Sequence, residues 1–171
     1  MARNHSKSKG VWMRIVKKGS GVPSVSIADA LDVALCYGWI TGQARSWDEK
    51  SWEGRFVPRR PGSIWSKINT ERAQKLIMEG RMKPAGLREI EEAKRDGRWA
   101  RAYSPPSRAT VPEDFLGELR KSEKAEAFFK TLNRTRVYSI IFRLETSKSG
   151  RLREAKIREM IRIFERGEWF R

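Results

Sequence analysis

Residues 40–58 read ITGQARSWDEKSWEGRFVP, and the expected architecture of the N-terminal half of the chain follows from this segment. Two extended segments, 40–47 and 52–58, flank the polar residues 48–51. That arrangement is typical of a β-hairpin with a four-residue loop. We therefore expect a small antiparallel β unit in this half of the protein.

The expected loop length also sets a register for the hairpin. A four-residue loop would place Trp47 opposite Trp52. Side chains alternate between the two faces of a strand, so Arg45 and Phe56 would then share one face.

The segment before the hairpin supplies a further strand and a helix. Residues 11–16 are mostly β-branched or aromatic, which favours a strand. Ser26 starts a helix, and Asp29 three residues later resembles a capping box. Gly38 fits the left-handed position that ends a helix.

From Ser63 onward the pattern is helical, and Ile64, Ile68, Leu76 and Ile77 form one apolar stripe. The predicted fold class is α+β: a small antiparallel β unit with a helix, followed by a predominantly helical C-terminal half. The expected organisation is a flexible basic tail at 1–10, an α+β region at 11–102, a connector at 103–112 and a helical region at 113–171 that packs on the first as one unit.

The net charge of +16, from 37 Lys or Arg against 21 Asp or Glu, is the strongest feature of the composition. Residues 1–20 hold six of these cations and no acid. Such a surplus favours nucleic acid, another polyanion or an acidic protein as partner. Solubility alone would also account for it, and the oligomeric state stays open.

Several kinds of chemistry are excluded or disfavoured by residue usage. His5 and Cys36 are the only histidine and cysteine, so neither a structural zinc site nor an intramolecular disulfide is expected. The sequence has no Gly-x-Ser-x-Gly elbow and no phosphate-binding loop. We expect no cofactor, no metal and no catalytic residue, and we favour a protein that is not an enzyme.

The sequence pattern also leads us to expect no secretory signal. Residues 1–10 are polar and basic, unlike the apolar core of a secretory signal. No apolar run approaches the roughly 18 residues that a membrane span needs. We therefore expect a cytoplasmic protein without a membrane span.

Arginine and tryptophan alternate through the hairpin and the start of the next helix. Guanidinium groups bind phosphate in a bidentate manner, and aromatic faces stack on bases. Ser63 at a helix start would add backbone N–H donors. The alternative is structural, with the tryptophans packing the hairpin on the helix and the arginines pairing with acids. The candidate anion- or nucleic-acid-binding residues are Arg45, Trp47, Trp52, Arg55, Arg59, Arg60, Ser63, Trp65, Lys67, Asn69 and Arg72.

A second basic face is predicted on the last helix. Arg151, Arg158 and Arg162 are spaced seven and four residues apart, so they share one side of the helix. A solvated charged surface is the alternative for this face.

A longer pattern resembles a known family. It comprises Asp-Ala-Leu at 29–31, Ala-Leu-Cys-Tyr-Gly-Trp-Ile at 34–40, Arg-Phe-Val-Pro-Arg at 55–59 and Gly-Arg-Met at 80–82. This resembles the YdeI/OmpD-associated family, also called bacteriocin-protection proteins, and the basic final helix is similar to that family too. The family usually has an aspartate just after Gly-Trp-Ile, where this chain has Thr-Gly at 41–42.

The resemblance implies a protein of stress or antimicrobial resistance. Three hypotheses follow for the function. The first is a non-enzymatic basic protein that recognises a polyanion such as nucleic acid through its Arg/Trp surface. The second is a bacteriocin-protection protein that acts through an acidic protein partner. The third is an enzyme on a small anionic substrate, with Arg45, Arg55 and Arg59 as the anion clamp.

Overall fold

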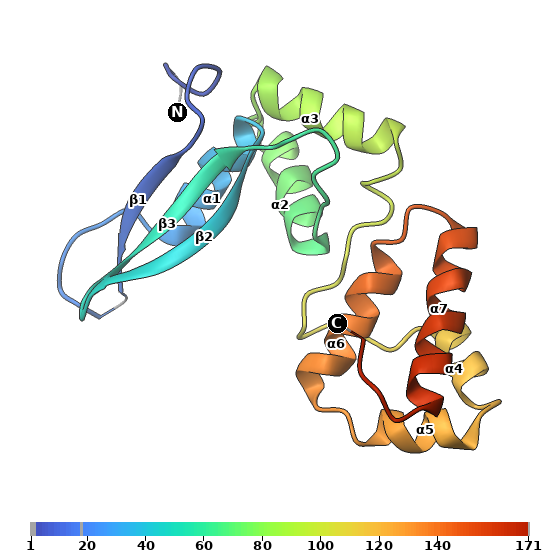
Figure 1. The fold of residues 1–171 in the computed structure, drawn as a ribbon. Coiled ribbons are helices and arrows are strands. Elements are labelled where there is room, and N and C mark those ends of the chain that lie inside the picture. The colour runs from blue at the N-terminus through green and yellow to red at the C-terminus, as the bar shows by residue number, and fades with distance from the viewer. Residues whose placement is uncertain (1–2, 18, 171) are drawn as a thin grey trace. The chain divides into compact units, whose positions relative to one another are not determined.

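The structure, a computed structural model, describes residues 3–17 and 19–170 (Figure 1). The chain forms two compact units, Met1–Ala100 and Arg101–Arg171. The first holds a three-stranded antiparallel sheet with helices, and the second is helical. The predicted α+β class is confirmed.

The sheet consists of β1 (Val11–Val16), β2 (Trp39–Asp48) and β3 (Ser51–Pro58) in the order β1-β3-β2. Both pairings are antiparallel, so β3 is the central strand. The register of the whole sheet therefore depends on which face each residue of β3 occupies.

The predicted hairpin is confirmed, but its predicted register is wrong. Asp48 pairs with Ser51, so the turn has two residues instead of four. The Asp48 carboxylate holds this short turn by accepting hydrogen bonds from the Lys50 backbone N–H and from the Ser51 hydroxyl. An irregularity between Ser46 and Asp48 absorbs the additional residue, and Ser46 instead of Trp47 lies opposite Trp52.

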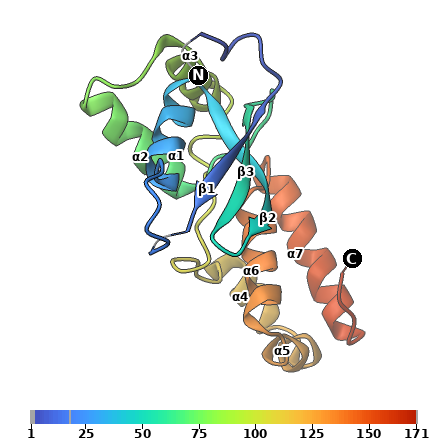
Figure 2. The same cartoon turned by 90° about the vertical axis from the view of Figure 1, so that its left-hand side faces the viewer.

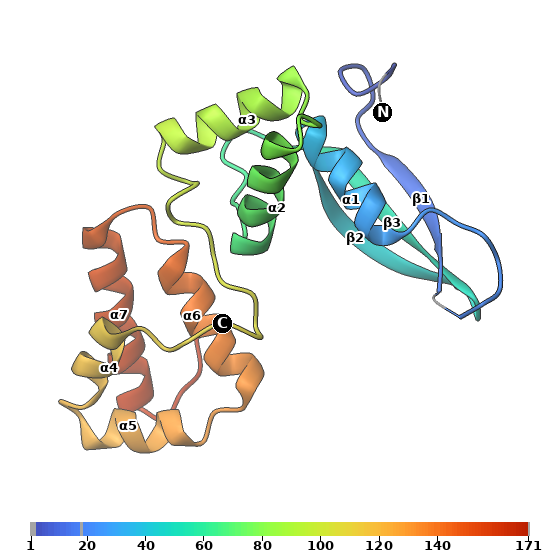
Figure 3. The same ribbon diagram turned by 180° about the vertical axis from the view of Figure 1, so that it is seen from behind.

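One face of the sheet is covered by α1 (Ile27–Cys36), which lies behind the sheet in Figure 1 and in front of it in Figure 3. The core between them contains Ala30, Ala34, Trp39 and Phe56. Because side chains alternate along β3, Arg55 points to the opposite face from Phe56, and Arg45 pairs with Glu53 on that same opposite face. The expectation that Arg45 and Phe56 share a face is thus wrong.

Local sequence explains both ends of α1. The Ser26 hydroxyl accepts from the Asp29 N–H at 3.0 Å and donates to the Asp29 carboxylate at 2.6 Å, as the capping pattern predicts. Gly38 has φ +73°, the left-handed conformation predicted for the helix end.

Two further helices pack on α1, as Figure 2 shows for α2 (Lys67–Met78). Helix α2 is capped by the Ser66 hydroxyl, which accepts from the Asn69 N–H. It therefore begins four residues after Ser63, the predicted start, because the Ser63 hydroxyl instead accepts from the N–H of Arg60.

The predicted apolar stripe of this region is only partly buried. Leu76 is buried, whereas Ile64, Ile68 and Ile77 are 39–40% exposed. The buried side chains of α2 are instead Thr70, Ala73 and Leu76. The small residues Thr70 and Ala73 allow α2 to pack closely, which leaves the larger isoleucines outside.

Helix α3 (Pro84–Arg95) approaches the end of α1 at a glycine. A Cβ atom on Gly86 would lie 2.5 Å from the carbonyl oxygen of Cys36 and 2.7 Å from that of Leu35. These are backbone atoms that cannot turn aside, so the glycine permits the close contact between the two helices.

The second unit contains α4 (Glu113–Leu119), α5 (Glu123–Lys130), α6 (Arg134–Glu145) and α7 (Gly150–Glu165). The predicted helical character of the C-terminal half is confirmed. Phe164 of α7 packs against the aromatic residues Phe115, Phe128, Trp169 and Phe170. The last residues of the described chain thus belong to the core of this unit.

The N-terminal segment contacts the first unit. The carbonyl oxygen of His5 accepts a hydrogen bond from Nε1 of Trp39 at 3.2 Å, and the His5 ring lies 4.8 Å from that of Tyr37. The sequence predicts a flexible tail at 1–10. In the described part of this segment, the contacts of His5 place it against the buried start of β2 at Trp39.

We expect Gly86→Ala to destabilise the first unit by about 1–3 kcal/mol, because the added methyl group would meet backbone carbonyl oxygens. Urea unfolding followed by tryptophan fluorescence measures this, since six of the seven tryptophans lie in residues 1–100. The control is Gly117→Ala in α4, where a Cβ would meet nothing within 4 Å. An unchanged midpoint in Gly86→Ala would contradict the close-approach account.

Candidate functional site

The face of the sheet opposite α1 carries exposed side chains from all three strands. We call it the open face and define it by Trp12, Arg14, Arg45, Glu53 and Arg55, which alternation and register place on one side. Trp12 is 38% exposed although it sits within a strand. Part of this aromatic ring therefore stays accessible from solvent.

Guanidinium groups cluster around the Trp12 ring. The guanidinium carbon of Arg45 lies 4.3 Å from the ring centroid, and that of Arg55 lies 5.9 Å from it. The guanidinium carbon of Arg14 lies 5.6 Å from the ring centroid of Trp47. These contacts hold arginines and indole rings in a mixed layer over the open face.

Two acids compensate two of these cations. Arg45 donates through Nε and Nη2 to one carboxylate oxygen of Glu53, at 2.7 and 2.6 Å. Arg14 contacts Asp48 at 2.5 Å and donates from Nε to the Ser51 hydroxyl at 2.9 Å. Within the described chain no carboxylate pairs with Arg55, which leaves its charge directed to solvent.

A groove at the Pro58 end of the open face concentrates positive charge. This cationic groove has a volume of about 500 Å³. Its lining includes Lys9, Arg55, Arg59 and Arg60 together with Ile40, Val57 and two prolines, and none of its lining residues is acidic. Size and charge both suit an anionic group attached to an apolar or aromatic body.

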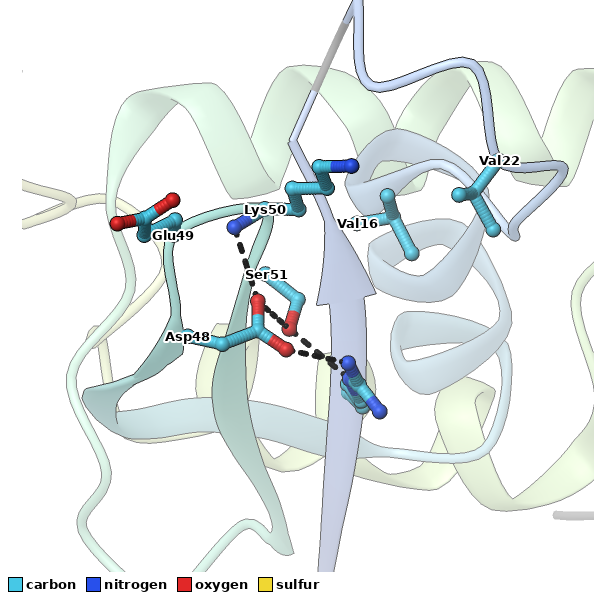
Figure 4. Close-up of a pocket in the computed structure, with 7 residues that line it drawn as sticks. Val16, Val22, Asp48, Glu49, Lys50 and Ser51 are labelled. Carbon is cyan, nitrogen blue, oxygen red and sulfur yellow. Dashed lines mark hydrogen bonds and ion pairs between the residues drawn. The ribbon is translucent and has the colours of Figure 1, made fainter.

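A second hollow lies at the opposite, hairpin-turn end of the same face (Figure 4). This turn pocket has a volume of about 570 Å³ and is lined by Arg14, Val16, Val22, Asp48, Glu49, Lys50 and Ser51. Hydrogen bonds to the Asp48 carboxylate from Arg14, Ser51 and the Lys50 N–H connect its polar lining. The pKa of Asp48 is lowered, chiefly by the hydrogen bond from Ser51.

The buried residues of the predicted set hold the segment that follows β3. Arg59 is 6% exposed, its guanidinium carbon lies 3.5 Å from the Trp65 ring centroid, and it donates to the Ile64 carbonyl at 3.1 Å. Trp65 is 1% exposed and lies against Trp99. This packing makes Trp65 a core residue and leaves Arg59 at the floor of the cationic groove.

Other members of the predicted set serve neighbouring contacts. Arg72 binds Asp32 at 3.2 Å and the Ala28 carbonyl at 3.1 Å, which ties α2 to α1. Trp52 lies on the α1 side of the sheet, away from Arg45 and Arg55. Lys67 and Asn69 lie in the first turn of α2.

The structure therefore brings together part of the predicted set. The residues that meet on the open face or in the cationic groove are Arg45, Arg55, Arg59, Arg60 and Ser63, with Trp47 at the hairpin end. Sequence reasoning missed Trp12, Arg14 and Lys9. The alternation of Trp12 and Arg14 with apolar Val11, Met13 and Ile15 was a signal for two of them.

The second predicted face lies in the C-terminal unit. Arg151, Arg158 and Arg162 are exposed on α7. Glu154 lies 3.8 Å from Arg158 and partly offsets its charge. A hollow of about 460 Å³ includes Arg158 in its lining and neither Arg151 nor Arg162.

Groups suited to catalysis or metal binding are sparse. Burial raises the pKa of the Cys36 thiol, which favours the unreactive protonated form. Among residues 3–17 and 19–170, no three His, Cys, Asp or Glu side chains are arranged to hold a metal ion. None of the helices in the described part of the chain has the length and apolar character needed to cross a membrane.

Comparison with known families matches the two units separately. Residues 1–89 match a family model described as a domain of unknown function (DUF8412). Residues 108–167 match the model described as bacteriocin-protection, YdeI or OmpD-associated, which confirms the family predicted from the sequence. The motifs between 29 and 86 lie within the first match. No curated protein and no solved structure gives a significant match.

The turn pocket generates a prediction for pH dependence. Because the pKa of Asp48 is lowered in the folded protein, its hydrogen bonds stabilise the turn above the ordinary aspartate pKa. That contribution disappears as the pH falls through the lowered value. We expect an NMR titration to show the Asp48 pKa rising in Ser51→Ala more than in Arg14→Ala, and the reverse order would contradict the assignment.

Proposed function

The chain belongs to the DUF8412 family, whose function is unknown, and carries a YdeI/OmpD-associated domain at 108–167, so we propose a function from the surface of the protein. We propose that the protein binds single-stranded nucleic acid across the open face of the sheet. In this proposal the cationic groove takes backbone phosphates and Trp12 stacks on a base. In this proposal the protein binds the nucleic acid and catalyses no reaction.

One observation carries the proposal. An exposed tryptophan, with two guanidinium groups over its ring, stands beside a groove whose lining has cations and no acid. Phosphate binding needs the cations, and base stacking needs the ring. Either feature alone would be ordinary on a charged surface, whereas together they match the two halves of a nucleotide.

The form of the surface favours a single strand over a duplex. Trp12 presents its ring within a sheet, and an aromatic face stacks on bases only when they are unpaired. In the described part of the first unit, α1 covers the opposite side of the sheet and not the open face, where a helix would be needed to enter a major groove. Val57 lines the cationic groove, and Ser51 lines the turn pocket at the hairpin-turn end of β3. The six residue steps between these positions span about 20 Å at roughly 3.3–3.4 Å per residue, which is room for several nucleotides.

Charge around the site also supports polyanion binding. Asp48 and Glu53 neutralise Arg14 and Arg45, while Arg55, Arg60 and Lys9 have no acidic partner in the described chain. A bound phosphate would displace counterions from these three groups, so affinity would fall with salt.

The phosphate contacts are tested by Arg55→Ala combined with Arg60→Ala. Fluorescence anisotropy with a labelled 12-nucleotide oligo-dT is measured from about 50 to 300 mM salt. We expect the salt slope to decrease by about 1.4, because each phosphate of a single strand that is no longer neutralised reduces it by about 0.7. The wild type should bind in the micromolar range at the lower salt.

The matched control removes two charges from the other unit. Arg158→Ala with Arg162→Ala takes two exposed arginines from α7 and leaves the open face intact. An equal decrease in affinity in both double variants would mean diffuse charge attraction and would contradict the proposed site. No binding at low salt, or saturable binding only to an acidic protein, would favour the protein-partner hypothesis.

The stacking contact is tested by Trp12→Ala. We expect binding free energy to weaken by about 1–3 kcal/mol with an unchanged salt slope, because a ring and no charge is removed. Trp12→Phe should retain most of the affinity. Circular dichroism checks that both variants are folded, and a folded Trp12→Ala protein with wild-type affinity would refute the stacking role.

A further inference from the structure

We propose that the turn pocket is a nucleobase pocket that prefers guanine at one end of the bound strand. This inference rests on the proposed function, because the pocket would act on a strand held by the open face. It adds base selectivity to an interaction that phosphate contacts and stacking leave independent of sequence.

Two valines give the pocket its apolar walls. Val16 is the last residue of β1, and Val22 comes from the loop between β1 and α1. Val22 is 54% exposed, so its side chain can contact a ligand in the pocket. A planar base placed beside these walls would bury apolar surface on the wall side.

The polar floor of the pocket is formed before any ligand arrives. The Asp48 carboxylate accepts from Arg14, Ser51 and the Lys50 N–H. Lys17 fixes the turn from the other side, since its N–H donates to the Lys50 carbonyl at 2.8 Å and its Nζ to the Glu49 carbonyl at 3.0 Å. A rigid floor reduces the ordering cost of binding.

Two hydrogen-bond donors of the lining are left over for a ligand, one on Lys50 and one on Arg14. Lys50 Nζ has no acceptor in the described chain, and Figure 4 shows its side chain extended toward Val16. Arg14 uses Nε and Nη2 on Ser51 and Asp48, which leaves Nη1. The Glu49 side chain points away from the valines in the same view.

This donor set selects among the bases. Guanine presents two acceptors, O6 and N7, on one edge, and lysine or arginine is their usual partner. Adenine and cytosine present an exocyclic amino group on the corresponding edge, which would face the cations with a donor. Thymine offers a single acceptor there, so guanine should bind most tightly and cytosine least.

The turn pocket lies on the same face of the sheet as the proposed contacts to the rest of the bound nucleic acid. Arg14, Val16, Asp48 and Ser51 lie on the same side of the sheet as Trp12. The pocket is at the hairpin-turn end and the cationic groove at the other, so the guanine would be terminal or next to terminal in a short oligonucleotide.

The test uses labelled eight-nucleotide oligo-dT with one terminal position replaced by dG, dA or dC, at the 5′ and the 3′ end in turn. Anisotropy titrations with the full chain should show a preference of about tenfold for dG over dC at one end only. Lys50→Met should abolish this preference while retaining binding of unsubstituted oligo-dT within about threefold.

The control is Lys124→Met, which removes an exposed lysine of α5 and should leave the dG preference unchanged. If every oligonucleotide binds equally well while Arg55→Ala with Arg60→Ala still weakens binding, the base pocket is refuted and the proposed function stands. If no oligonucleotide binds at low salt, both are refuted. A dG preference that survives Lys50→Met would also overturn the assignment of the pocket.

Discussion

The central strand β3 constrains everything else in the first unit. It pairs with β1 on one side and β2 on the other, and Phe56 in its middle is fully buried against α1. Burial of Phe56 fixes the alternation, so Arg55 and Glu53 must face the opposite side. A slip of one residue would bury Arg55 and expose Phe56, which makes this register strongly preferred over its neighbours.

The open face follows from that register and from its ion pairs. Glu53 is central among the cations, and its side chain is only 12% exposed where it pairs with Arg45. The pairing keeps Arg45 above Trp12, where the cation and the ring stabilise each other. The face is thus held in place by its own contacts, while Arg55, Arg60 and Lys9 keep the uncompensated charge that the proposed ligand binding requires.

Sequence patterns predicted the elements more reliably than their contacts. The strand at 11–16, the Ser26 cap and the helices of the second unit followed from local signals that need no distant partner. The two-residue turn did not, because it depends on hydrogen bonds to the Asp48 carboxylate. Trp12 was missed because its proximity to Arg45 and Arg55 comes from pairing between β1 and β3, about forty residues apart. Trp65 was included because composition alone does not distinguish a tryptophan stacked on a buried arginine from an exposed one.

The most direct test of the ligand surface uses the indole N–H resonances of the seven tryptophans. A ¹⁵N-labelled sample is titrated with unlabelled 12-nucleotide oligo-dT, and each resonance is assigned by a Trp→Phe variant. The account predicts that Trp12 and Trp47 shift strongly, while the buried Trp39 and Trp65 change little. Shifts confined to Trp169, or none at saturating oligonucleotide, would contradict the claim that the open face of the sheet is the binding surface.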